Sequence, residues 1–203
     1  MNPLPSPRRR PPRTRPLRLA ILLTVGLLGC GGAIMKENGR RAAHGLRAIA
    51  TAEVLLRAQD LDSNRLMDYW TGDVAQLHFM APKGKPIGLI DKALAAADAK
   101  PLKPSPDPAS YAGYWFVAME RDEGVEPSEQ VYRIDTDGKT GKTHNHARFG
   151  FCAYPAAYGS SGTSTYIINE NNLVYSRDTG WQPVLRWPAH PEKNGWSPEQ
   201  GFR

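Results

Sequence analysis

Cysteine is scarce in this chain, which has two cysteines among 203 residues. Cys30 lies in an apolar stretch, and Cys152 lies in a segment that is expected to form a strand. A bond between them would require a membrane-type segment to reach the core of a folded domain. A disulfide framework of the kind found in small secreted proteins is therefore not supported.

Sequence motifs for catalysis are also lacking. The loop at residues 82–86 carries two lysines and two prolines but lacks the spacing of a phosphate loop. The segment GSSG at residues 159–162 is one residue short of the Gly-x-Ser-x-Gly turn that presents a nucleophilic serine. We therefore predict that the protein is not an enzyme and uses no cofactor.

Acidic residues are absent from the first 36 positions, whereas residues 1–18 contain six arginines. Those six account for the whole net charge of +6, so the rest of the chain is neutral. A neutral domain offers no basic surface that would follow a phosphate backbone, which predicts that nucleic acid is not a partner. Six prolines among the arginines prevent a helix, so residues 1–18 are expected to be a disordered, basic leader in the cytoplasm.

Long apolar runs are limited to one stretch, Leu19–Met35, which has no charged residue in 17 positions. A helix that spans a bilayer needs roughly 17–25 residues. We favour an uncleaved signal anchor, which makes the chain a single-pass protein of the bacterial inner membrane with its C-terminal domain in the periplasm or outside the cell. Two alternatives stay open. One is a cleaved secretory signal, and the other is a lipoprotein signal, because residues 27–30 (LLGC) resemble a lipobox that would be lipidated at Cys30.

No proline interrupts residues 17–81, and a helical period follows the apolar stretch. Apolar residues recur there at steps of three and four, which predicts an amphipathic helix over about residues 36–60. We place Val54 on its apolar face and Glu53 on its polar face. Several glycines weaken the junction between the two parts, so we expect a break or kink near residues 31–39.

The second half of the chain is typical of strands and turns. It follows an alanine-rich segment at residues 87–99, which favours a short helix, and a stiff proline-rich linker at residues 101–108. The segments expected to form strands are 113–119, 130–134, 148–154, 163–169 and 173–176. Residues 181–203 are rich in tryptophan and proline and are expected to be mostly irregular.

Together these segments predict an α+β fold. An N-terminal membrane helix continues into an amphipathic helix, which packs on a C-terminal antiparallel sheet of four to five strands. The expected domain covers residues 36–180, between the transmembrane or signal segment at residues 19–35 and the tail at residues 181–203.

Two stretches resemble bacterial type IV pilins and pseudopilins. Residues 46–56 (LRAIATAEVLL) are similar to the Leu-Arg-x-Ile-x-Thr-Ala segment of many pilin-like secreted proteins. Residues 149–178 are similar to their terminal strand, glycine turn and hairpin, above all in an uncharacterised family of bacterial extracellular proteins. The resemblance implies a pilin-like fold and a role in assembly or protein–protein contacts, with further copies of the chain or secretion-system proteins as partners.

The apolar stretch differs from that of prepilins. It lacks their glycine–aromatic cleavage motif, and the first acidic residue of the chain is Glu37. The resemblance therefore implies a pilin-like domain on a different kind of membrane tether. The alternative is a periplasmic lipoprotein of binding or chaperone type.

A few residues of the second half have the chemistry of metal ligands. The sequence HNH places His144 and His146 on the same side of an extended chain, as half of a metal site would require, although no carboxylate or cysteine partner is evident nearby. The sequence DTDG at residues 135–138 resembles the start of a calcium loop, but its twelfth position holds a histidine instead of glutamate. We take both histidines with Asp135 and Asp137 as metal-ligand candidates; a polar loop and a hairpin turn are the alternatives.

Overall fold

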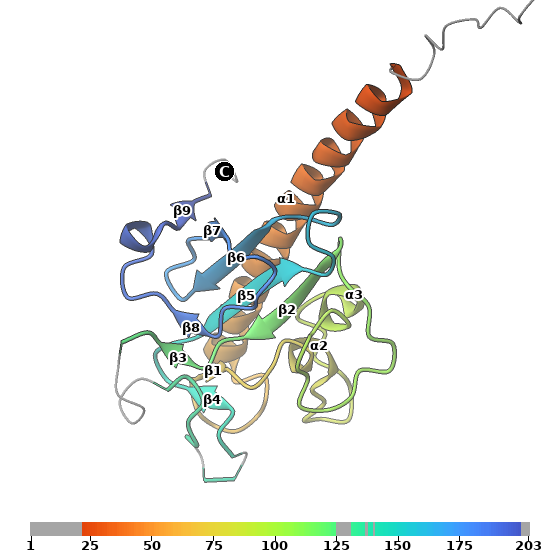
Figure 1. Cartoon of the computed structure of the whole chain (residues 1–203). Helices are drawn as coiled ribbons and strands as arrows, with labels where there is room; N and C mark the ends of the chain where they lie inside the picture. The colour runs from red at the N-terminus through yellow and green to blue at the C-terminus, as the bar shows by residue number, and fades with distance from the viewer. Residues whose placement is uncertain (1–21, 125–130, 137, 140, 200–203) are drawn as a thin grey trace, which may run out of the picture.

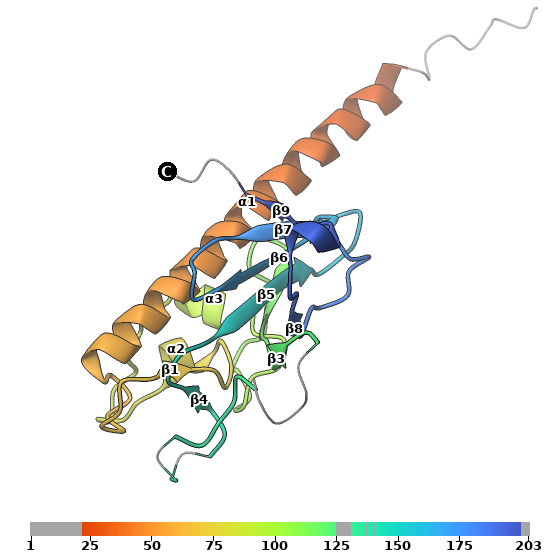
Figure 2. The same ribbon diagram turned by 90° about the vertical axis from the view of Figure 1, so that its left-hand side faces the viewer.

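The computed structural model describes residues 22–124, 131–136, 138, 139 and 141–199, with side chains from residue 31 onward. Its longest element is the helix α1 (Leu22–Gln59), whose 38 residues correspond to a length of about 57 Å. The C-terminal half of α1 lies along one face of a sheet, and its N-terminal end projects well beyond that sheet (Figures 1 and 2). The helix therefore has a packed half and a free half.

The main sheet has five strands and is antiparallel throughout. In spatial order its strands are β2 (Tyr114–Ala118), β5 (Gly150–Pro155), β6 (Ser164–Asn169), β7 (Tyr175–Asp178) and β9 (Ser197–Pro198). The expectation of an α+β fold with an antiparallel sheet of four to five strands is confirmed.

The fifth strand comes from a different part of the chain than expected. Strand β9 lies in the tail at residues 181–203 and pairs with β7. Of the segment expected as a strand at residues 130–134, only isolated bridges are seen in its described part, where Val131 pairs with Arg121 and Ile134 pairs with His144.

The remaining elements are short. Two small sheets join β1 (Tyr69–Trp70) to β4 (His144–Asn145) and β3 (Arg121–Asp122) to β8 (Arg186–Trp187). The short helices are α2 (Gln76–Phe79), α3 (Lys92–Ala95) and the 3-10 helix η1 (Glu192–Asn194). Helices α2 and α3 lie beside β2, at the edge of the main sheet opposite to β9 (Figure 1).

The buried face of α1 packs on the sheet through small and aliphatic side chains. Ala42, Leu46 and Ile49 are fully buried there, as the helical period predicts. The last turns of the helix differ from the prediction, because Val54 is 54% exposed and Glu53 is fully buried. The buried stripe therefore includes a carboxyl group.

Helix α1 is continuous, so the expected break near residues 31–39 is wrong. Two of its glycines do not bend the helix but allow the sheet to pack closely against it. A Cβ atom at Gly45 would lie 3.0 Å from the ring of Phe116, and one at Gly39 would lie 2.2 Å from the hydroxyl of Tyr166. The missing side chains let the sheet approach the helix.

The expected membrane segment is only partly described. Residues 1–18 and 19–21 lie outside the described residues, and so do the side chains of residues 22–30, including Cys30. Over the part of the chain that the structure describes, no helix combines the length and the apolar character needed to cross a membrane.

Candidate functional site

A buried histidine lies where the end of α1 meets the small β1–β4 sheet. The pairing of β4 with β1 sets His144 opposite Trp70, and their rings meet edge to face with centroids 5.1 Å apart. The Nε2 atom of His144 lies 2.8 Å from Oδ2 of Asp62, and its Nδ1 atom lies 3.0 Å from the hydroxyl of Thr143. Both ring nitrogens are therefore held in fixed directions.

A second aspartate completes the group. Asp68 is fully buried and accepts hydrogen bonds from the side-chain amide of Asn64 and, at 2.6 Å, from the hydroxyl of Thr136. One ligand atom from each of Asp62, Asp68 and His144 lies within 4.8 Å of the other two. We call these three residues the acid–histidine cluster.

Glu53 reaches the same region from α1. Its Oε2 atom accepts a hydrogen bond of 2.9 Å from the backbone N–H of Trp70, whereas its buried Oε1 atom has no hydrogen-bond partner among the residues that the structure describes. Burial raises the pKa of Glu53 well above the ordinary value of 4.5, and the charges of Asp68 and Asp62 raise it further. The protonated form of Glu53 is therefore favoured beside the cluster.

An open cleft of about 520 Å³ lies against the cluster. Asp62, Thr143 and His144 form part of its wall. Most of its other lining residues are apolar and include Phe79 and Leu102, and Lys103 also lines it. A small solute or ion can therefore approach the cluster from this side.

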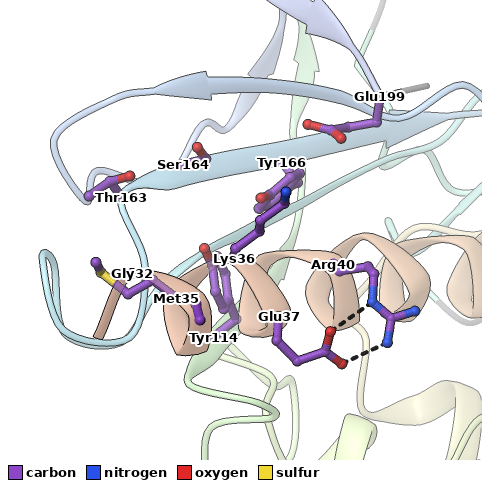
Figure 3. Close-up of a pocket in the computed structure, with 11 residues that line it drawn as sticks. Gly32, Met35, Lys36, Glu37, Arg40, Tyr114, Thr163, Ser164, Tyr166 and Glu199 are labelled. Carbon is purple, nitrogen blue, oxygen red and sulfur yellow. Dashed lines mark hydrogen bonds and ion pairs between the residues drawn. The ribbon is translucent and has the colours of Figure 1, made fainter. Parts of the chain in front are cut away.

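A second, larger groove of about 710 Å³ lies where α1 leaves the sheet. Figure 3 shows Lys36 of α1, Tyr114 of β2 and Tyr166 of β6 pointing into it. Glu37 and Arg40 form a two-pronged ion pair on α1, with distances of 2.8 and 2.7 Å. Because both side chains are about half exposed, this pair adds little to stability. The groove presents polar groups of both charges beside the free half of the helix.

The structure separates the predicted metal-ligand candidates. It places His144 in the acid–histidine cluster, whereas His146 is exposed two residues further along the chain. Asp135 is exposed and accepts a hydrogen bond from the backbone N–H of Gly138 in its own turn. Asp137 lies outside the described residues. Neither His146 nor Asp135 is in the group that contains His144.

Three acidic residues of this site were missed by the sequence prediction. Glu53 carried a signal, since it lies four residues after Ile49 and three before Leu56 on the buried stripe of α1. No sequence pattern pointed to Asp62 or Asp68. Asp62 is 82 positions from His144 in sequence, and only the fold brings these two residues together.

The fold and these two regions define an α+β protein with a long projecting helix, a polar groove at its exit and a buried acid–histidine cluster. A family described as proteins of unknown function, DUF2950, matches residues 38–196, and the chain belongs to this family. No curated protein and no solved structure matches the chain significantly.

Proposed function

We propose that this chain is a membrane-anchored envelope protein of pilin-like type that acts through assembly or protein–protein contacts and not through catalysis. Its N-terminal segment, Leu19–Met35, would hold it in the bacterial inner membrane. Its domain would face the periplasm or the outside of the cell. Further copies of the chain or secretion-system proteins are the proposed partners.

One observation carries the proposal, namely the free half of α1. Residues 31–34 are all exposed, and Ile34 has 53% of its surface accessible. Past Gly39 the helix is packed, since that position is buried against Tyr166. An exposed apolar side chain on this projecting helix, such as Ile34, is suited to a bilayer or to a neighbouring protein.

The alternative is a lipoprotein of binding or chaperone type. The LLGC sequence at residues 27–30 supports it, because the cysteine of a lipobox becomes the lipidated N-terminal residue. In that case the exposed part of α1 would begin directly at the lipid anchor. Both versions leave the groove beside Lys36 and Tyr166 facing outward near the membrane surface.

Site-specific photo-crosslinking tests the role in protein contacts. A crosslinking residue at Ile34 should give adducts of higher mass in intact cells, because this side chain lies on the free half of the helix. The matched control is Met67, which is 68% exposed but lies past the other end of α1. Equal yields at both positions, or a strictly monomeric product at Ile34, would contradict the proposed contacts.

A further inference from the structure

We propose that Asp62, Asp68 and His144 bind one divalent transition-metal ion of the zinc type. The inference is independent of the membrane tether. It concerns the acid–histidine cluster, which lies at the opposite end of the packed helix from the projecting half.

The spacing of the ligand atoms fits a metal ion. Zinc binds imidazole nitrogen and carboxylate oxygen at about 2.0–2.2 Å, so two neighbouring ligand atoms on one ion lie about 3.0–3.5 Å apart. The Nε2 atom of His144 and the Oδ2 atom of Asp62 are already 2.8 Å apart, and one carboxylate oxygen of Asp68 lies within 4.8 Å of a ligand atom of each of these residues. A small displacement of side chains therefore completes a three-ligand site.

The negative charge of the two carboxylates also favours a bound cation. Asp68 is fully buried, and the side chain of Asp62 is 5% exposed. Among the described residues, no lysine or arginine forms an ion pair with either carboxylate. Two buried carboxylates and one imidazolium would leave one negative charge, whereas two carboxylates, a neutral imidazole and a divalent ion sum to zero. Buried charges are stable when they are neutralised in this way.

An independent feature points to a missing partner. The Oε1 atom of Glu53 is fully buried, and no described residue forms a hydrogen bond with it. The other carboxyl oxygen, Oε2, accepts a hydrogen bond from Trp70, whose ring lies against His144. Buried polar atoms are nearly always satisfied, and an unsatisfied one commonly marks a bound ion or water. A water molecule carried by the metal ion is the kind of partner that this oxygen lacks.

The residues around the cluster behave as supports for metal ligands. Thr143 holds Nδ1 of His144, so that Nε2 faces Oδ2 of Asp62, and an ion bound by both atoms would replace their direct contact. Thr136 and Asn64 hold the carboxylate of Asp68. Partners of this kind fix the orientation of ligating side chains. The mixture of imidazole and carboxylate favours zinc over calcium, which prefers oxygen ligands alone.

Zinc titration of the purified, chelator-treated full-length chain tests the site. Calorimetry should show one zinc ion per chain, with a rise in melting temperature that calcium does not produce at the same concentration. The nitrogen resonances of the His144 ring should shift when zinc is added, while those of His146 stay in place. Asp68→Asn and Asp62→Asn should each weaken zinc binding by at least about 100-fold, since loss of an outer support alone costs 10–100-fold.

The matched controls are His146→Ala and Asp135→Asn, the exposed candidates that the structure separates from the cluster. Both variants should bind zinc within about twofold of the unchanged chain, because neither residue belongs to the cluster. Removal of a residue that orients a metal ligand would weaken binding by about tenfold or more. The wild-type calorimetry and ring resonances decide the matter even if an aspartate variant fails to fold. No zinc binding by the wild-type chain, or binding that depends on His146 and not on the two aspartates, would overturn the proposal.

Discussion

Phe116→Ala is expected to lower the free energy of unfolding by about 3–5 kcal/mol, the usual cost of removing a fully buried phenylalanine ring. Phe116 has no exposed surface, and its ring stands against Gly45 of α1. Its backbone pairs with Ala153 of β5 on one side and bonds to residues 97 and 99 on the other. One side chain thus fills the space where the helix, the sheet and the segment after α3 meet.

Urea unfolding of the purified chain measures this loss, and Met67→Ala is the control. Met67 is 68% exposed, so its truncation should change the free energy of unfolding by less than about 0.5 kcal/mol. A similar loss from both variants would show that Phe116 is not a centre of packing.

A double-mutant cycle with Gly45 sharpens the result. In the unchanged protein, Gly45→Ala gains helix propensity but sets a methyl group 3.0 Å from the Phe116 ring. In the Phe116→Ala background the contact with the ring is gone, and the remaining close neighbour, Cδ1 of Leu94 at 3.2 Å, can move into the space that the ring leaves. The same change should therefore stabilise the chain there, by up to about 0.5–1 kcal/mol. The coupling between the two positions should therefore be clearly different from zero.

Asp98→Ala is expected to cost about 3 kcal/mol or more, because it removes the acceptor of three backbone N–H groups. Oδ2 of Asp98 accepts from Val74 and Ala75 at 2.7 and 2.9 Å, and Oδ1 accepts from Lys100 at 2.8 Å. The carboxylate joins the turn before α2 to the chain after α3. The control is Asp91→Ala at the exposed N-cap of α3, whose side chain makes no cap hydrogen bond.

The effect of Asp98 should also depend on pH. Burial raises the pKa of Asp98 from 3.8 to about 6, although the bonds from Lys100, Ala75 and Val74 act in the opposite direction. Because the pKa is higher in the folded chain than in the unfolded chain, protonation favours folding. This contribution, up to about 3 kcal/mol, is complete below about pH 4 and is lost as the pH rises through 6.

Unfolding at pH 4 and at pH 7 separates this effect from the loss of hydrogen bonds. The difference in unfolding free energy between the wild-type chain and Asp98→Ala should be larger at pH 4 than at pH 7. A difference that grows as the pH rises would mean that the pKa of Asp98 is lowered by its hydrogen bonds instead of raised by burial.

The sequence predicted the helix and most of the sheet because their apolar residues follow clear patterns. Strands β2 and β6 fall within the segments expected from their aromatic and β-branched residues, and β5 overlaps its expected segment but extends one residue past it, to Pro155. Strand β9 could not be predicted in this way, because it has two residues and one is a proline. Its place at the sheet edge, where a proline is tolerated, depends on pairing with β7.

The candidate site was harder to predict than the fold. Glu53 has the helical position of a core residue, but its charge favoured the surface. It is accommodated inside because the N–H of Trp70, 17 positions later, meets its carboxyl group. The HNH sequence made His144 a metal-ligand candidate, yet the acidic groups beside it are Asp62, whose Oδ2 lies 2.8 Å from its Nε2, and Asp68, within 4.8 Å, and only the fold brings these residues together.

The proposed membrane tether is tested most directly by the mature N-terminus of the protein in its own cells. Intact-mass and N-terminal analysis of the membrane fraction should find an unmodified, full-length chain that begins before Leu19. A chain that begins at a diacylated Cys30 would establish the lipoprotein alternative instead. Recovery of the protein only as a soluble cytoplasmic species would contradict both forms of the tether.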